Sequence, residues 1–121
     1  MPFPNLPYFF DGPDFKLTES LAIHKYIADK WQPELLGRDV AERANVNMLA
    51  GVISEMQWAV RWPCYSSAEK EPIFLIIREK LPPIVQFMSN DFLVGSNVTW
   101  MDFYFYETIE LMAALMEDKF Y

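Results

Sequence analysis

The chain has 121 residues, of which 52% are hydrophobic and 17% aromatic, and its formal net charge is −7 at pH 7. This composition supplies the core of one ordinary domain and excludes a disordered tail. The acidic balance argues against a nucleic-acid partner or an anionic membrane surface, because both attract basic proteins. The single cysteine, Cys64, and the single histidine, His24, exclude an internal disulfide and argue against a metal site.

The first predicted element is a β-hairpin. An apolar, aromatic stretch at residues 6–10 and an alternating stretch at residues 15–17 flank Asp11-Gly12-Pro13-Asp14, whose residue types form turns. Pro7 has no N–H to donate, so it belongs at the start or the edge of its strand.

A helix follows the hairpin, and a domain boundary follows the helix. The apolar positions of the helix are Leu21, Ile23, Tyr26, Ile27 and Trp31. Thr18 and Ser20 are both possible N-caps. Pro33 marks the exit from the helix, and the loop after it is predicted to separate residues 1–32 from residues 38–121.

A long helix is predicted to begin at Asp39, which together with Glu42 resembles a capping box. Its apolar stripe consists of Met48, Leu49, Val52, Ile53, Met56 and Val60. Gly51 costs helix stability, and close packing against another element is the predicted reason for it. Pro63 is expected to kink or end the helix.

Two further helices are predicted in the rest of the chain. Pro82 and Pro83 lie inside the apolar pattern of the first and predict a kink. Thr99 and Asp102 have the spacing of a capping box at the start of the second. The body of this last helix is apolar nearly all round, so we expect it to be central and buried. No apolar run reaches the ~18 residues that a membrane helix needs.

Several short motifs occur in a distinctive order along the chain. They are Phe3-Pro4-Asn5-Leu6-Pro7-Tyr8, Asp11-Gly12, Lys16-Leu17-Thr18-Glu19-Ser20, Ala22-Ile23 with Tyr26-Ile27-Ala28, Glu42-Arg43-Ala44, Leu81-Pro82 and Val98-Thr99-x-x-Asp102-Phe103. In this order they resemble cytosolic glutathione transferases of the mu and sigma type. The resemblance covers nearly the whole chain.

The resemblance implies a mainly α (α+β) fold. A partial thioredoxin-like domain, made of the β-hairpin and one helix, would be followed by an incomplete all-helical C-terminal domain of the glutathione transferase kind. The family's preceding βαβ unit, which carries the tyrosine that favours the glutathione thiolate, and its closing helices are expected to lie outside the chain. We therefore expect no catalytic residue within it, and no activity of these residues alone.

The resemblance also implies a glutathione-binding role for five residues near the N-terminus. Leu6, before a cis Pro7, would offer its backbone N–H and C=O to the cysteinyl part of glutathione, and Asn5 would lie beside it. Ser20 and the helix N-terminus would hold the γ-glutamyl carboxylate, and Glu19 would receive the ammonium group. Mu-type enzymes usually have Gln in place of Glu19. For Glu19 and Ser20, plain helix capping has similar weight; for Pro7, an ordinary trans proline is the alternative.

Three other residues receive roles from the same resemblance. Glu55 would reach across a dimer to the partner's glutathione, although a solvated helix face is the more common reason for such a residue. Tyr65 would line the pocket for the electrophile, or serve only in packing. Phe3 would insert into the neighbouring subunit, or be a frayed terminal residue.

Two functions follow as hypotheses. The first is a cytoplasmic, dimeric glutathione S-transferase, complete only with the missing segments, that joins the thiolate of its co-substrate glutathione to small electrophiles without a metal. The second is a non-catalytic module of the same fold within a larger assembly, because a hairpin without partner strands needs a covering partner. A small unrelated helical binding protein is a third possibility, which leaves the order of the motifs unexplained.

Overall fold

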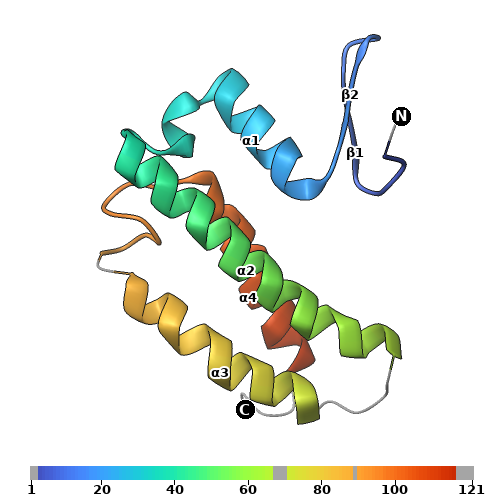
Figure 1. Cartoon of the computed structure of the whole chain (residues 1–121), viewed down its shortest axis with the longest axis vertical. Helices are drawn as coiled ribbons and strands as arrows, with labels where there is room; N and C mark the ends of the chain where they lie inside the picture. Colours follow the sequence, from blue (N-terminus) through green and yellow to red (C-terminus); the bar gives the residue numbers. More distant parts are fainter. Residues whose placement is uncertain (1–2, 67–70, 89, 117–121) are drawn as a thin grey trace.

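A computed structural model describes residues 3–66, 71–88 and 90–116 of the chain. The elements are β1 (Tyr8–Asp11), β2 (Phe15–Thr18), α1 (Ser20–Trp31), the 3-10 helix η1 (Pro33–Leu36), α2 (Val40–Ser66), α3 (Glu71–Phe87) and α4 (Trp100–Leu115). The predicted fold class is confirmed, since a two-stranded hairpin and one helix precede a set of longer helices (Figure 1). The division at residues 32 and 38 stays a prediction.

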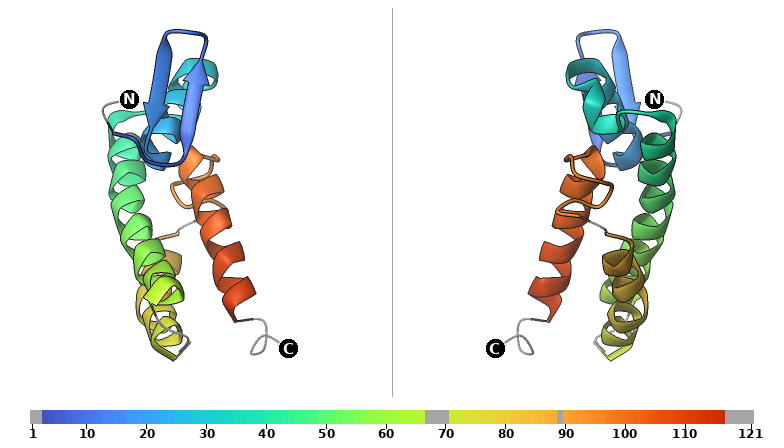
Figure 2. Two further views of the ribbon diagram at one scale, coloured as in Figure 1. Left: turned by 90° about the vertical axis from the view of Figure 1, so that its right-hand side faces the viewer. Right: turned by 90° about the vertical axis from the view of Figure 1, so that its left-hand side faces the viewer.

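The hairpin is antiparallel, with Tyr8 opposite Thr18 and Asp11 opposite Phe15. Gly12 has a φ of 72°, which a glycine adopts without steric cost, and it makes the tight turn between the strands. The hairpin stands at one end of the molecule, beside the start of α1 (Figures 1 and 2).

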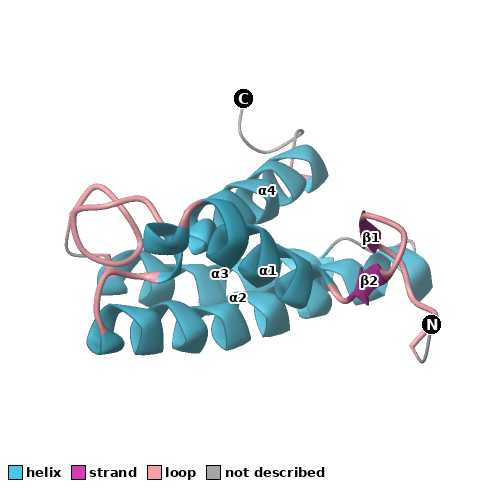
Figure 3. Cartoon of the chain, turned by 90° about the horizontal axis from the view of Figure 1, so that it is seen from above, coloured by secondary structure: helices cyan, strands magenta, loops and turns pink. Residues whose placement is uncertain are grey.

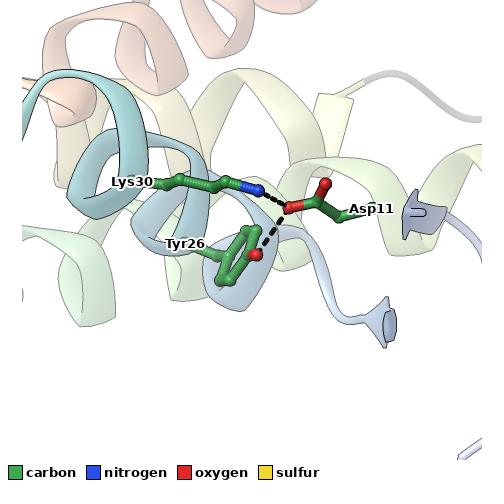
Figure 4. A network of polar contacts seen from close by, with 3 residues as sticks. All are labelled: Asp11, Tyr26 and Lys30. Carbon is green, nitrogen blue, oxygen red and sulfur yellow. Dashed lines mark hydrogen bonds and ion pairs between the residues drawn. The ribbon is translucent and has the colours of Figure 1, made fainter. Parts of the chain in front are cut away.

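A polar network ties the far end of β1 to α1 (Figure 4). The Asp11 carboxylate accepts a hydrogen bond of 2.6 Å from the Tyr26 hydroxyl and pairs with the Lys30 ammonium. The Tyr26 ring stacks on Phe15, with ring centroids 4.5 Å apart. These contacts orient the hairpin on the first helix and thereby place the segment before β1.

The start of α1 differs from the sequence-based expectation. Neither Thr18 nor Ser20 is the N-cap: Thr18 ends β2, Ser20 is the first helical residue, and Glu19 between them has a φ of 73°. Glu19 makes no side-chain capping bond. The chain turns from strand to helix within this one residue, so no room remains for a conventional cap.

Helix α2 is the centre of the fold, because it contacts α3, α4 and η1 (Figure 3). Its core residues are Val46, Leu49, Ala50, Ile53, Met56 and Val60. Asp39 caps the helix by accepting from the N–H groups of Ala41 and Glu42, while the Glu42 carboxylate accepts from Arg38 and not from Asp39.

Other expectations for α2 are wrong in detail. Met48 and Val52 were expected in the buried stripe but are 49% and 43% exposed. Gly51 does not mark a close approach, because a Cβ there would meet no atom within 4 Å. Pro63 does not end the helix, which continues to Ser66; a kink at Pro63 stays a prediction. A proline in the last turn removes only one hydrogen bond, so the helix tolerates it.

Helices α3 and α4 pack on α2 through one face each. Helix α3 runs through Pro82 and Pro83 to Phe87; the kink expected there stays a prediction. In α4, Trp100, Met101, Tyr104, Thr108 and Met112 are buried. The expectation of an all-round buried α4 is wrong, since Phe103 and Tyr106 are 56% and 61% exposed. Among the described residues, only α1 and α2 make extensive contact with it.

The start of α4 confirms the capping pattern. The Asp102 carboxylate accepts from the Thr99 N–H at 2.7 Å and from the Thr99 hydroxyl at 2.8 Å. Its other oxygen accepts from the Leu93 N–H at 2.8 Å, so the same carboxylate holds the preceding loop. Within the described residues, no helix combines the length and the apolarity needed to cross a bilayer.

Candidate functional site

A cleft of about 520 Å³ lies where the N-terminal segment, the start of α1, α2 and α4 meet. This volume is within the range of small-molecule sites. Its lining residues are Asn5, Leu6, Glu19, Ser20, Leu21, Ala22, Ser54, Gln57, Trp58, Arg61, Tyr65 and Tyr104. The cleft has two chemically different walls.

The first wall is backbone-rich and polar. Leu6 and Pro7 are joined by a cis peptide bond, as the family resemblance implies, and Leu6 is 74% exposed. On the same wall, Ser20 is the first residue of α1, where the first N–H groups of a helix have no intrahelical partner. Asn5 Nδ2 lies 3.4 Å from Glu19 Oε1. The N–H groups at the start of α1 can donate hydrogen bonds to a carboxylate of a ligand, and the Glu19 carboxylate can bind a cationic group.

The second wall is one face of α2. Ser54, Trp58, Arg61 and Tyr65 recur at steps of three and four residues, so they project on the same side of the helix. Trp58 is 63% exposed and Tyr65 is 83% exposed. This wall combines two aromatic rings with one guanidinium group.

A buried hydrogen-bond network supports the floor of the cleft. The Tyr104 hydroxyl donates to Gln57 Oε1 at 2.8 Å, and Gln57 Nε2 donates to the Thr108 hydroxyl at 3.0 Å. Thr108 in turn donates to the backbone carbonyl of Tyr104 at 2.8 Å. The network joins α2 to α4 with every one of these side chains satisfied, which keeps the two helices in a defined register.

The structure gathers some of the sequence-predicted residues and leaves others apart. Asn5, Leu6, Glu19, Ser20 and Tyr65 all line the cleft. Pro7 adjoins the cleft through its cis bond with Leu6 but does not line it.

Glu55 and Phe3 are not among the lining residues of the cleft. Glu55 pairs with Lys80 of α3 at 3.2 Å, and its side chain is 73% exposed. Phe3 is 70% exposed. Both residues therefore lie on the surface outside the cleft, and their expected contacts with a second subunit stay predictions.

Sequence reasoning missed the α2 wall apart from Tyr65. Counting back from Tyr65 by four, seven and eleven residues gives Arg61, Trp58 and Ser54, so helical spacing could have found all three. Gln57 and Tyr104 were not recoverable in this way, because their role depends on the contact between α2 and α4. No group of three or more potential metal ligands occurs among the residues that the structure describes.

Known proteins match this chain along most of its length. The model of the glutathione S-transferase N-terminal domain matches residues 1–29. The class-mu 26 kDa glutathione S-transferase isozyme of Schistosoma japonicum is 36% identical over 115 residues, which cover 91% of this chain and 51% of that protein. A class-mu 26 kDa isozyme of Schistosoma mansoni is 38% identical, covering 90% of this chain and 56% of that protein.

A third relative comes from a vertebrate. Glutathione S-transferase 2 of Gallus gallus is 35% identical over 120 residues, which cover 96% of this chain and 53% of that protein. The chain thus spans about half the length of the curated relatives it matches. Together with the fold and the cleft, these matches define a protein with a thioredoxin-like first part and a helical second part. The chain belongs to the glutathione S-transferase family.

Proposed function

We propose that the protein containing this chain is a glutathione S-transferase that joins glutathione to small electrophiles. The observation that carries the proposal is the cleft, which is lined both by Asn5, Leu6, Glu19 and Ser20 and by the aromatic face of α2. The co-substrate of the family is glutathione, and the polar wall suits its charged γ-glutamyl end. The aromatic wall suits an apolar electrophile.

The proposed roles of the polar wall are those that the family resemblance implies, and its chemistry is compatible with them. Leu6, freed by the cis bond, presents its backbone N–H and C=O to the cysteinyl part of glutathione. The Ser20 hydroxyl and the N-terminus of α1 hold the γ-glutamyl carboxylate, since the helix dipole favours an anion there. Glu19 accepts the ammonium group, and Asn5 lines the site beside it.

The reaction is nucleophilic substitution by the glutathione sulfur. The thiol loses its proton to solvent, and the thiolate forms a bond to the electrophilic carbon as the leaving group departs with its bonding electrons. We assign no residue of this chain to the activation of the thiol.

The proposed protein is a cytoplasmic homodimer. The exposed aromatic residue Phe3 would insert into the neighbouring subunit, and Glu55 would approach the partner's glutathione. The lone cysteine Cys64 is exposed and free, which fits a reducing compartment.

The test uses the protein encoded by the complete gene. Conjugation of glutathione to 1-chloro-2,4-dinitrobenzene, followed by absorbance, is expected to exceed the uncatalysed rate and to saturate with glutathione. Retention on immobilised glutathione is expected as well. Absence of both turnover and saturable glutathione binding would overturn the proposal.

A second candidate function is a non-catalytic module within a larger assembly. The observation that favours it is the exposure of large apolar side chains outside the cleft, such as Trp62 at 63%, Leu75 at 66% and Phe10 at 59%. This function predicts that the protein isolated under native conditions elutes together with other polypeptides and lacks conjugating activity. Activity of the purified protein without them would contradict it.

A further inference from the structure

The α2 wall of the cleft contains a cation that the proposed binding of glutathione does not use. Arg61 is exposed and makes no hydrogen bond or ion pair with any residue that the structure describes. It lies three residues after Trp58 and four residues before Tyr65, so the guanidinium is flanked by both rings along the helix. The polar wall, in contrast, is built from the N-terminal segment and α1.

From this arrangement we propose that Arg61 and Trp58 make the enzyme selective for planar aromatic electrophiles that carry a carboxylate or sulfonate group. The inference rests on the proposed transferase function and adds the substrate class to it. The aromatic ring of the electrophile stacks on Trp58, and its anionic group accepts hydrogen bonds from the Arg61 guanidinium, whose planar fork matches a carboxylate.

The charges around the cleft support this assignment. Among the described residues, Glu19 is the only acidic residue that lines the cleft, and it belongs to the polar wall and not to α2. The chain as a whole carries a net charge of −7, which repels an anionic ligand at long range. The guanidinium of Arg61, unpaired among the described residues, provides a local positive charge that attracts it. Neither the carboxylate of Glu19 nor any other described residue neutralises Arg61 through an ion pair.

The supporting side chains are well placed to keep this wall in position. Gln57, adjacent to Trp58, is buried and hydrogen-bonded to both Tyr104 and Thr108. Trp58 and Arg61 therefore extend from a turn of α2 that is fixed on α4. A wall that is fixed before binding loses less entropy when the ring of the electrophile stacks on it.

The kinetic experiment uses a matched pair of electrophiles with the full-length protein. They are 4-chloro-3,5-dinitrobenzoate and 4-chloro-3,5-dinitrobenzotrifluoride, which differ only in the anionic group. In both, the thiolate bonds to the ring carbon that carries chlorine, chloride leaves with the bonding electrons, and the thiol proton goes to solvent. The measured quantity is the ratio of kcat/KM for the benzoate to that for the benzotrifluoride.

Arg61→Gln is expected to lower this ratio about three- to tenfold, the magnitude of one partly exposed charge-assisted hydrogen bond. Arg61→Lys is expected to give an intermediate ratio, because it keeps the positive charge but lacks the planar fork. Trp58→Leu is expected to lower kcat/KM for both electrophiles by a similar factor, because stacking does not depend on the anionic group. Arg78→Gln is the control: it removes the same charge from the exposed face of α3 and should leave the ratio unchanged.

A binding measurement separates this inference from the proposed function. Equilibrium dialysis with 3,5-dinitrobenzoate and 3,5-dinitrobenzotrifluoride, which lack the leaving group, needs no turnover. Arg61→Gln should raise Kd for the benzoate about three- to tenfold and leave Kd for the benzotrifluoride unchanged. If the protein showed no turnover but Arg61→Gln still weakened binding of the benzoate and not of the benzotrifluoride, the transferase function would be rejected and the anion-binding role of Arg61 would stand.

Two results would overturn the inference itself. One is an unchanged benzoate-to-benzotrifluoride ratio and an unchanged benzoate Kd in Arg61→Gln. The other is an equal rise of the KM for glutathione with both electrophiles, which would assign Arg61 to a carboxylate of glutathione.

Discussion

At the scale of single residues, Glu19 illustrates how a local conformation serves the cleft. Its φ of 73° lies in the left-handed region, which costs a non-glycine residue ~1–3 kcal/mol. The turn at Glu19 ends β2 and begins α1 at the next residue, so Ser20 stands at the positive end of the helix and lines the cleft. The position of Ser20 thus depends on the backbone conformation of Glu19, which the residue preferences at helix N-caps do not predict.

Ser20→Ala is expected to raise the KM for glutathione about five- to tenfold in the full-length protein, with a smaller change in kcat. The variant removes one hydrogen bond to a carboxylate but leaves the backbone N–H groups of α1 in place. Initial rates at varied glutathione concentration measure the effect. Ser66→Ala, at the end of α2 where the hydroxyl bonds Trp62 O, is the control and should leave the KM unchanged. An unchanged KM in Ser20→Ala would remove Ser20 from the proposed site.

The hairpin contact predicts a dependence of stability on pH. The Lys30 ammonium, with the Tyr26 hydroxyl, holds the pKa of Asp11 below its ordinary value. A lowered folded-state pKa contributes stability above the unfolded value of about 3.9, and this contribution is lost as the pH falls through the folded-state pKa. Asp11→Asn should therefore lower the urea midpoint at pH 7, and the difference from the wild type should shrink below about pH 4. A constant difference between pH 7 and pH 3 would contradict this account.

At the scale of elements, the junction between η1 and α2 depends on one glycine. Gly37 has a φ of 110°, and a Cβ there would lie 2.7 Å from the backbone nitrogen of Arg43. The Gly37 carbonyl also accepts a hydrogen bond of 2.9 Å from Arg43 Nε. The turn after η1 is therefore packed directly on the first turn of α2, and the packing leaves no space for a side chain.

Gly37→Ala is expected to lower the free energy of unfolding by more than about 1 kcal/mol, because both the backbone conformation and the contact with Arg43 oppose a Cβ. Urea denaturation followed by circular dichroism measures the change. Gly12→Ala is the matched control: its φ of 72° is also positive, but no atom lies within 4 Å of the added Cβ. A larger loss in Gly12→Ala than in Gly37→Ala would refute the steric argument.

At the scale of the whole molecule, the exposed apolar side chains raise the question of assembly. Phe3, Met48 and Val52 are exposed in the single chain, and Glu55 lies on the outer side of α2 together with the last two. A surface of this kind is typical of protein interfaces. The homodimer of the proposed function would cover part of it.

The full-length protein is expected to sediment as a dimer at micromolar concentration. Phe3→Ser should raise the dimer dissociation constant about tenfold or more, the usual effect of removing an aromatic anchor from an interface. Phe10→Ser is the control, because Phe10 is similarly exposed but lies in β1 with no expected role in the dimer. A monomer at all concentrations, or equal effects of the two variants, would reject the assigned role of Phe3.

The sequence by itself determined the order of the elements and the polar half of the cleft. Turn residues, helical spacing and capping patterns are local properties, so the hairpin, the helices and the Thr99–Asp102 cap could be predicted from neighbouring residues. The motif around Leu6 and Pro7 and the pair Glu19-Ser20 contain residues that line the cleft or adjoin it, while their roles toward glutathione stay predictions.

Only the tertiary structure decided which faces of the helices are buried and what stands opposite the polar wall. The apolar residues of α4 suggested that it is buried, and the glycine inside α2 suggested close packing at Gly51. Burial depends on how many elements pack around a helix, and α4 is covered on one face only. Trp58 and Arg61 look like an ordinary solvated face in the sequence. They become a cleft wall because the tertiary structure brings this face of α2 into one cleft with the start of α1 and the segment before β1, which are far from it in the sequence.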